Sequence, residues 1–422
     1  MRLLKAFIRS AAYERRFLAK NQWDLAMVLW IPLATVLLVW WIFSQTQITD
    51  LPIGVIDQDN GPIANTLVRY LEASPALTVH QQYHSPADVE AAILQRDVYA
   101  VVVIPEDFSR NISSSKPAPI VLQVNAQYGT HSGIIQTSVQ SVVGTLSAGV
   151  EIQRMVKQGM APSQAAINYS PIAIQRTNLF NAINNYQQFL ASTVIPALLH
   201  ILAMVIGATT IGRELRDKQL GRWSRFIDIG TPDLILANYS GQYKNNNTES
   251  SNNIKKASLS VLFAGLLGKY FWPILAYSIW SALALWLATP QQSVDTVSLL
   301  ITYMSLVLLI ILSFWLGAVF TLGSFSLRMG LSATGFISVP SYAFAGVTYP
   351  YIAITDSAKY WADALPLTHY LQLHIAQLQM QAPLTVSLPI VYGLLLATVI
   401  AIILMVFLTK RALSHPERWG AR

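Results

Sequence analysis

Six long runs of apolar residues divide the chain, and polar or charged residues border each of them. About 20 consecutive apolar residues are enough for a helix to cross a hydrocarbon core of roughly 30 Å. The pattern therefore predicts six transmembrane helices, over residues 25–43, 189–211, 270–288, 297–322, 331–347 and 388–409. The fifth run carries Gly330, Gly335, Pro340 and Gly346 in or beside it, so a broken or re-entrant segment near residues 331–370 is the alternative there.

The first run could also be the core of a signal peptide. It is longer than such cores usually are, and Phe43 to Thr46 offers no small-x-small cleavage site. An uncleaved anchor is therefore predicted.

Before this anchor, residues 1–22 place Leu4, Phe7, Ala11 and Leu18 near helical spacing among basic residues. This pattern predicts an amphipathic helix in the cytoplasmic interface, with a merely basic leader as the alternative.

The Lys and Arg residues gather at the ends of the apolar runs, as cytoplasmic loops require. Basic residues precede the first span, follow the second and the sixth, and are absent from the loop 289–296. This arrangement predicts cytoplasmic termini, a cytoplasmic loop over 212–269, a cytoplasmic tail over 410–422 and an outside location for 45–188. The predicted location is a bacterial inner membrane, with spans three to six between residues 270 and 409.

Residues 45–188 alternate between strand-like and helix-like patterns. Leu77 to Gln81, Tyr99 to Ile104 and Ile120 to Val124 resemble short strands, and Ser85 with Pro86 predicts a helix start. The spacing of apolar residues over 133–160 predicts a long amphipathic helix. The predicted fold class is therefore an α-helical polytopic membrane protein with an inserted α/β extracytoplasmic domain.

Candidate chemistry in this domain is sparse. Asp57 and Asp59 flank a turn, where a turn or helix-cap role is favoured over a metal or catalytic one. His80 and His84 lie four residues apart without a third ligand in pattern, which favours surface polarity over a metal site. No nucleophile elbow or zinc-protease motif occurs in the sequence. We therefore predict no catalytic, metal or cofactor-binding residues, and a protein that is not an enzyme.

Composition supports a membrane protein. Hydrophobic residues make up 53% of the chain and charged residues 12%, about half the usual charged share of a soluble domain. The mean hydropathy is +0.42. The chain contains no cysteine, which excludes disulfides and thiolate sites. Its formal charge of +7 lies at the ends of the apolar runs rather than on a nucleic-acid-binding face, so no nucleic-acid partner is expected.

The predicted spans carry essentially one titratable side chain, His200, and a buried or interfacial histidine is favoured there over a proton relay. Gly265 to Tyr270 resembles a phosphate loop, but its glycine spacing is too short and Tyr270 replaces the required Ser or Thr. The chain therefore has neither an ion-coupling path nor a nucleotide site of its own. Energy for transport would have to come from another subunit.

Several motifs, in this order along one topology, resemble the type-two ABC exporter permeases, in the subgroup with a large periplasmic domain after the first span. Arg213 to Asp217 resembles the family's R-E-x-E-x-G-T element, although Lys218-Gln219 replaces Gly-Thr. Leu266 to Lys269 resembles its L-G-K element before the third span, and Gly346 to Pro350 with Leu365 to Tyr370 resembles a paired motif near the outer face. Residues 176–181 resemble the run that leads into the second span.

The resemblance implies a permease subunit that exports a substrate, an amphiphilic drug or a lipid-like molecule, with ATP and Mg held by a separate cytoplasmic ABC ATPase subunit. A second permease copy or paralogue and a periplasmic adaptor are the other implied partners. Implied residues for ATPase coupling are Arg213, Glu214, Arg216, Asp217, Arg222 and Trp223, against the simpler interpretation of a charged helix end. Positions that match family motifs are Gly268, Lys269, Gly346, Pro350, Pro366 and Thr368.

Two further expectations remain. Residues 238–256 are rich in Asn and poor in apolar residues, which predicts a flexible insert in the cytoplasmic loop.

The alternative function is a membrane-anchored receptor or scaffold that acts through its periplasmic domain. Five spans beyond the first argue against that alternative, because an anchor needs one or two.

Overall fold

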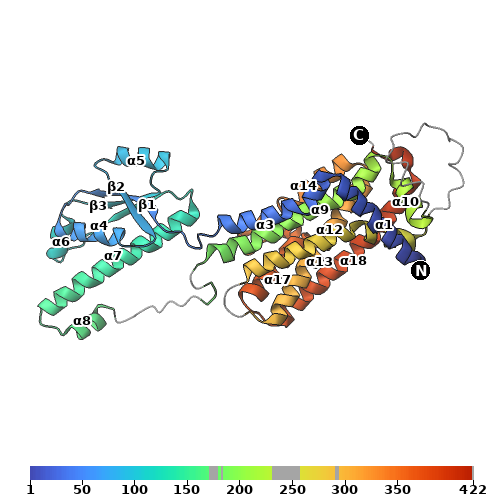
Figure 1. Ribbon diagram of the computed structural model, residues 1–422. Coiled ribbons are helices and arrows are strands. Elements are labelled where there is room, and N and C mark those ends of the chain that lie inside the picture. Colours follow the sequence, from blue (N-terminus) through green and yellow to red (C-terminus); the bar gives the residue numbers. More distant parts are fainter. Residues whose placement is uncertain (171–178, 182–183, 231–256, 290–293, 421–422) are drawn as a thin grey trace. The chain divides into compact units, whose positions relative to one another are not determined.

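The computed structural model describes residues 1–170, 179–181, 184–230, 257–289 and 294–420. It divides into two compact units, one of Met1–Thr46 with Leu179–Arg422 and one of Gln47–Asn178 (Figure 1). We call the first the membrane unit and the second the α/β unit. The predicted Asn-rich insert and residues 176–178 of the run 176–181 lie outside the described residues.

The α/β unit is built on a four-stranded sheet in the order β2-β1-β3-β4, with β4 antiparallel to β3 and the other pairs parallel. The strands are β1 (Leu51–Asp57), β2 (Leu77–Gln82), β3 (Ala100–Ile104) and β4 (Val121–Val124). The helices are α4 (Pro62–Glu72), α5 (Pro86–Gln95), α6 (Phe108–Ser113), α7 (Gly129–Lys157) and α8 (Pro162–Tyr169). Ser85 caps α5 by accepting a hydrogen bond from the backbone N–H of Asp88, as predicted.

Apolar side chains bury both faces of the sheet. On one face, Ile53 and Val102 pack with Leu67 of α4 and Ile135 of α7. On the other face, Val101 belongs to a smaller core with side chains of α5. Burial on both sides explains why β3 is a continuous β-branched run rather than an alternating one.

Asp57 and Asp59 shape the turn between β1 and α4. Asp57 Oδ1 accepts hydrogen bonds from the backbone N–H groups of Asp59 and Asn60, both at 3.0 Å. Asp59 Oδ2 accepts from the backbone N–H groups of Gly61 and Ser109, both at 3.1 Å. The carboxylates thus satisfy backbone donors, the turn role favoured by the sequence. Within the described residues, no group of three or more His, Asp or Glu side chains could hold a metal ion.

The membrane unit contains four helices in its described residues that are long and apolar enough to span a bilayer. They are η1 with α9 (Gln187–Arg216), α12 (Leu259–Ala288), α13 (Thr296–Ser324) and α18 (Leu384–Ser414). A fifth span forms if α2 (Gln22–Val28) and α3 (Trp30–Ile42), which bend by 42° at Leu29, are counted together. The structure therefore supports four or five spans rather than the six predicted.

The difference lies in the predicted span 331–347, which is broken into short helices, the alternative that its glycines and Pro340 had suggested. They are α14 (Leu327–Ser338), α15 (Ser341–Phe344), η2 (Tyr351–Ala353), α16 (Asp356–Ala364), α17 (Pro366–His374) and η3 (Ile375–Gln379). α14 ends two residues before Pro340, which has no backbone N–H and so cannot donate the hydrogen bond that would continue the helix. Gly346 then takes a positive φ of 78°, which turns the chain.

The shorter elements beside the spans are α1 (Arg2–Lys20), α10 (Leu220–Asp228) and η4 (Pro416–Arg418). α1 is helical as predicted, and its buried positions include Ala6, Ser10 and Leu18 at helical spacing. The interfacial location of α1 stays a prediction. In Figure 1, α1 and α10 lie side by side at the end of the membrane unit where the chain begins.

Close packing of α9 against α13 forms the centre of the membrane unit. Gly207 of α9 faces the backbone of Phe314, and Gly317 of α13 faces the backbone of Met204, so two glycines let the helices approach. Tyr270 of α12 donates a hydrogen bond of 2.7 Å to the carbonyl of Gly207. His200 Nδ1 lies 2.6 Å from Ser313 Oγ, so this buried histidine has a hydrogen-bond partner within the packed helices.

Two π-helical turns meet at the other end of α9. η1 (Gln187–Ala191) precedes α9, and η3 follows α17. Gln379 of η3 donates hydrogen bonds to the carbonyl of Gln188 at 2.9 Å and to Ser192 Oγ at 2.8 Å. The amide of Gln379 thus joins the start of α9 to the segment that follows α17.

Candidate functional site: a buried ion-pair chain

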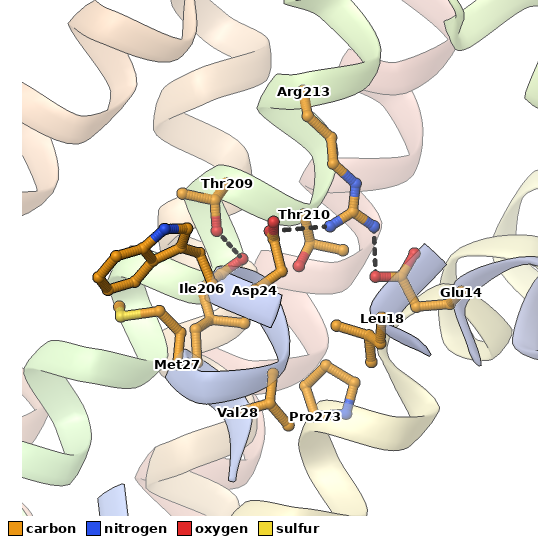
Figure 2. Close-up of a pocket in the computed structure, with 11 residues that line it drawn as sticks. Glu14, Leu18, Asp24, Met27, Val28, Ile206, Thr209, Thr210, Arg213 and Pro273 are labelled. Atoms are coloured by element: carbon orange, nitrogen blue, oxygen red, sulfur yellow. Dashed lines mark hydrogen bonds and ion pairs between the residues drawn. The ribbon is translucent and has the colours of Figure 1, made fainter. Parts of the chain in front are cut away.

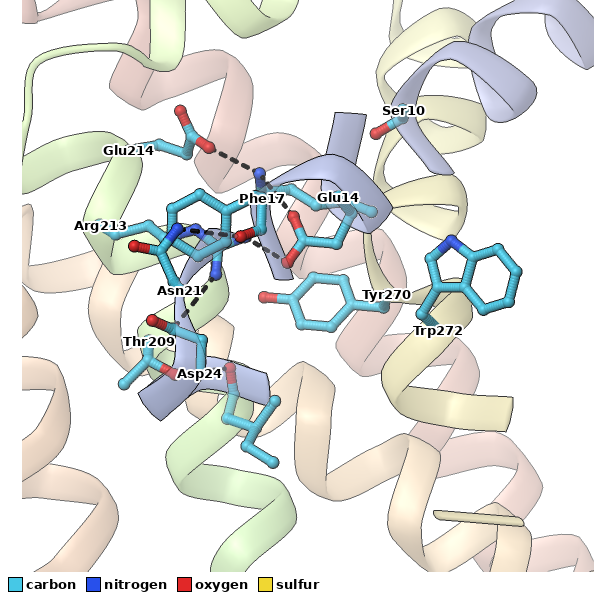
Figure 3. Close-up of polar contacts among 12 residues, drawn as sticks. Ser10, Glu14, Phe17, Asn21, Asp24, Thr209, Arg213, Glu214, Tyr270 and Trp272 are labelled. Carbon is cyan, nitrogen blue, oxygen red and sulfur yellow. Dashed lines mark hydrogen bonds and ion pairs between the residues drawn. The ribbon is translucent and has the colours of Figure 1, made fainter. Parts of the chain in front are cut away.

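Five charged side chains from four helices form a chain of alternating sign within the membrane unit. The sequence of contacts is Glu214, Lys269, Glu14, Arg213 and Asp24. Figure 3 labels Glu214, Glu14, Arg213 and Asp24 of this set. Lys269 Nζ lies 2.7 Å from Glu214 Oε1 and 3.4 Å from Glu14 Oε2. Arg213 pairs with Glu14, and its Nη1 lies 3.5 Å from Asp24 Oδ1. We call this set the ion-pair chain.

The ion-pair chain is almost fully withdrawn from solvent. The side chains of Lys269 and Glu14 are 0% exposed, Glu214 is 3% exposed and Arg213 is 6% exposed. Two acidic and two basic groups therefore balance in the interior, while Asp24 stands at the edge with 34% exposure. Such groups are tolerated inside a protein only when they are paired and hydrogen-bonded.

Aromatic rings surround the cations. The Arg213 guanidinium lies 3.7 Å from the centre of the Phe17 ring, and Lys269 Nζ lies 5.0 Å from Tyr13 and 5.5 Å from Trp223. These distances fit cation–π attraction, which is stronger where water is excluded. Burial and the neighbouring Glu214 carboxylate raise the pKa of Tyr13, so its hydroxyl stays neutral beside the ion pairs.

Backbone packing and indole hydrogen bonds hold α1 in place around these charges. Gly268 of α12 lies against the carbonyl of Phe7, where a Cβ would collide with it, so this glycine allows α1 and α12 to touch. Trp272 donates to the carbonyl of Ala11 at 3.0 Å. Trp223 of α10 donates to Ser10 Oγ at 3.1 Å. The helices α1, α10 and α12 thus form one packed assembly with the end of α9.

A second set of contacts fixes the far end of α10 to α1. Arg2 Nη2 lies 2.6 Å from Asp228 Oδ1. Arg9 Nη1 donates to the carbonyls of Ile227 at 3.3 Å and Asp228 at 3.1 Å. Carbonyls at the end of a helix have no partner within the helix, and Arg9 supplies one here. α10 is therefore bound to α1 both through Trp223 and at its C-terminal end.

A small cavity of about 130 Å³ borders the ion-pair chain (Figure 2). Its lining includes Glu14, Asp24 and Arg213 together with Thr209 and Thr210 of α9. Among these lining residues, Arg213 has a buried Nε atom with no hydrogen-bond partner in the part of the chain that the structure describes. The volume is enough for a few water molecules, which are the usual partners of such buried polar atoms.

The structure separates the predicted coupling residues into two groups. Arg213, Glu214 and Trp223 are buried and belong to the ion-pair chain or its walls. Arg216, Asp217 and Arg222 are exposed, and Arg216 Nε pairs with Asp217 Oδ1 at 2.8 Å. Only the second group presents side chains that another protein could contact directly.

The positions that match family motifs also fall in two places. Gly268 and Lys269 lie at the ion-pair chain, where Lys269 is fully buried. Gly346, Pro350, Pro366 and Thr368 lie in the segment from α15 to α17. Of these, Pro366 begins α17 at its first turn, and Thr368 is buried.

Glu14, the centre of the ion-pair chain, was not among the site residues predicted from the sequence. A signal was present, because Glu14 is the one acidic residue among residues 1–22, a strongly basic stretch. It also follows Ser10 by four residues and precedes Leu18 by four, on the buried stripe of α1. An acidic residue on the apolar face of an amphipathic helix predicts a buried cationic partner.

The fold and the ion-pair chain define an integral membrane protein whose first helix is bound to the ends of its spans. A protein-family model described as ABC-2 family transporter protein matches residues 23–227. Two curated relatives from Escherichia coli, one from strain K12 and one from O157:H7, are each called "Probable multidrug ABC transporter permease YbhR".

Each relative is 21% identical over 220 residues, which is 50% of this chain and 56% of the relative. The chain thus aligns with a little over half the length of these relatives. Together with the family match, they confirm the resemblance to ABC-2-type permeases that the motifs predicted.

Proposed function

We propose that this chain is the permease subunit of an ATP-driven exporter, and that the ion-pair chain carries motion from a partner ATPase to the spans. The observation that supports this most directly is the burial of Lys269 between Glu14 and Glu214. Lys269 links α12 to α1 and to the end of α9 through buried ion pairs, and separating these charges would carry a large energetic cost. These elements should therefore move together.

In this proposal, a cytoplasmic ABC ATPase subunit binds ATP and Mg and contacts the exposed side of the α9–α10 turn. That side carries Arg216, Lys218, Arg222 and Arg225, with Asp217 among them. A mostly basic surface fits an acidic patch on a partner, and complementary charge fixes orientation. Nucleotide-driven closure of two ATPases would displace α10, and the buried contacts of Trp223 would pass that displacement to α1.

The remaining assignments belong to the same proposal. The termini and α10 lie in the cytoplasm of a bacterium, the α/β unit lies outside its inner membrane, and two permease copies or paralogues form the path. The α/β unit gates the exit or receives a periplasmic adaptor. The substrate is an amphiphilic drug or lipid-like molecule, in keeping with the multidrug permease named among the relatives.

Reversing two exposed charges, Arg216→Glu with Arg222→Glu, should reduce co-purification of the ATPase at least about tenfold, because like charges would then face its acidic patch. The measurement is the molar ratio of ATPase to permease after mild solubilisation, with ATP turnover of the eluate. Lys157→Glu, an exposed charge reversal on the α/β unit, is the matched control and should leave both unchanged.

An unchanged ATPase ratio in the double variant would contradict the assignment of this surface. A wild-type preparation without any ATPase, across several mild detergents and nanodiscs, would favour the receptor or scaffold instead. Ligands of the α/β unit would then be the next subject of study.

A further inference from the structure

An apolar groove of about 580 Å³ runs between α13 and α18 and ends at the α16–α17 junction. It is separate from the ion-pair chain and shares no residue with it. Its walls come from aliphatic side chains of the two long helices, such as Leu312 and Leu316 of α13 and Ile390 and Leu404 of α18. Among the described residues that line it, none is Lys or Arg.

Small residues on one face of α18 give the groove its depth. Pro389, Gly393, Ala397 and Ala401 recur at intervals of four and therefore share a face of the helix. A Cβ added at Gly393 would meet nothing within 4 Å, so this glycine leaves open space rather than allowing a close helix contact. This differs from Gly207 and Gly317, whose missing Cβ atoms are filled by the neighbouring backbone.

One end of the groove carries a carboxylate. Asp363 is exposed at the end of α16, and the Tyr351 hydroxyl donates a hydrogen bond of 2.8 Å to its Oδ1. His369 Nε2 lies 2.8 Å from the backbone carbonyl of Asp363, which holds the imidazole at the same end. The carboxylate therefore keeps a second oxygen for a ligand, next to a long apolar trough.

We propose that this groove binds a cationic amphiphile with a single alkyl chain. The alkyl chain lies along Gly393 and Ala397, and the ammonium head group pairs with Asp363. Apolar length and one anionic end match such a molecule in both shape and charge, whereas an anionic amphiphile would meet a like charge. The assignment of the groove to the export route rests on the proposed function. The binding of the amphiphile does not depend on that function.

Binding is measured on the full chain in nanodiscs of zwitterionic lipid, without any ATPase. The chain has no native cysteine, so an Ile400→Cys variant on the groove wall takes one environment-sensitive fluorophore. Dodecyltrimethylammonium is the cationic probe, and dodecyl maltoside is the neutral probe with the same alkyl chain. We expect a saturable emission shift with dodecyltrimethylammonium and a weaker response with dodecyl maltoside.

Two further variants separate the contributions of charge and shape. Asp363→Asn should weaken dodecyltrimethylammonium binding about tenfold, the loss of one charge-assisted contact, and should leave the maltoside response unchanged. Gly393→Leu fills the groove and should abolish the saturable response to both probes. Asp356→Asn, an exposed carboxylate at the start of the same helix α16, is the matched control and should behave like the parent.

Equal binding of the two probes, or an unchanged affinity in Asp363→Asn, would overturn the proposal and assign the groove to bilayer lipid. Efficient disulfide-linked dimers of the unlabelled Ile400→Cys variant would overturn it in favour of a second copy of this chain. Because the assay contains no ATPase, its result is independent of whether the Arg216 and Arg222 surface binds one.

Discussion

Replacing Lys269 with methionine should lower the free energy of unfolding of the membrane unit by about 3–5 kcal/mol, the usual cost of removing one partner from a buried ion pair. Methionine keeps most of the length of lysine but leaves Glu14 and Glu214 without their shared cation. Two buried carboxylates would then repel each other at a site with almost no access to water. Thermal unfolding in detergent, followed by circular dichroism, would show the transition about 10 °C lower.

The control is Lys359→Met, which removes a pair with Asp356 that is separated by three residues on the exposed helix α16. Exposed pairs of this kind contribute at most about 1 kcal/mol, so its transition should move little. Adding Glu214→Gln to Lys269→Met removes one of the two stranded charges and should restore part of the stability. Equal unfolding temperatures for Lys269→Met and the parent would show that the ion-pair chain does not stabilise the packing of α1.

Gly317→Ala should destabilise the membrane unit by about 3 kcal/mol or more, even though alanine favours helices over glycine. A Cβ at this position would lie closer to the carbonyl of Met204 than two non-bonded atoms can, so α9 and α13 would have to separate. Their separation would also disturb the Tyr270 hydrogen bond to Gly207. The measurement is again thermal unfolding, together with the monodisperse yield on gel filtration.

Gly323→Ala in the same helix is the matched control, because a Cβ there would meet nothing within 4 Å. The gain in helix propensity should make this variant as stable as the parent or slightly more so, by up to about 1 kcal/mol. The two substitutions are chemically identical and should differ in the sign of their effect. If both are neutral, the close approach of α9 and α13 is not maintained in the membrane.

The sequence was informative wherever a pattern is local. The spans around α9, α12, α13 and α18 are long apolar runs, and the start of α5 was readable from Ser85 and Pro86. The run 331–347 is the instructive case. Hydropathy predicted a span there, whereas Pro340 and the neighbouring glycines suggested the alternative of a broken segment, and the chain forms short helices.

The candidate site was harder to predict because its residues are far apart in the chain. Arg213 and Glu214 were identified from a local motif, but their partners Glu14 and Lys269 lie on other helices. A charged motif next to a span looks the same in sequence whether it faces a partner protein or the interior. Only tertiary packing shows that Arg213 is buried and Arg216 is not.

The length of the second span has a mechanical consequence. From Gln187 to Arg216 it runs for 30 residues, or roughly 45 Å, with the ion-pair chain at one end and the Gln379 contacts at the other. If this helix tilts as a rigid rod about its Arg213 end, a tilt of about 5° displaces the opposite end by roughly 4 Å over that length. Such a displacement exceeds the reach of the two Gln379 hydrogen bonds. A small rotation at the Arg213 end would thus be enough to break the Gln379 hydrogen bonds at the other end.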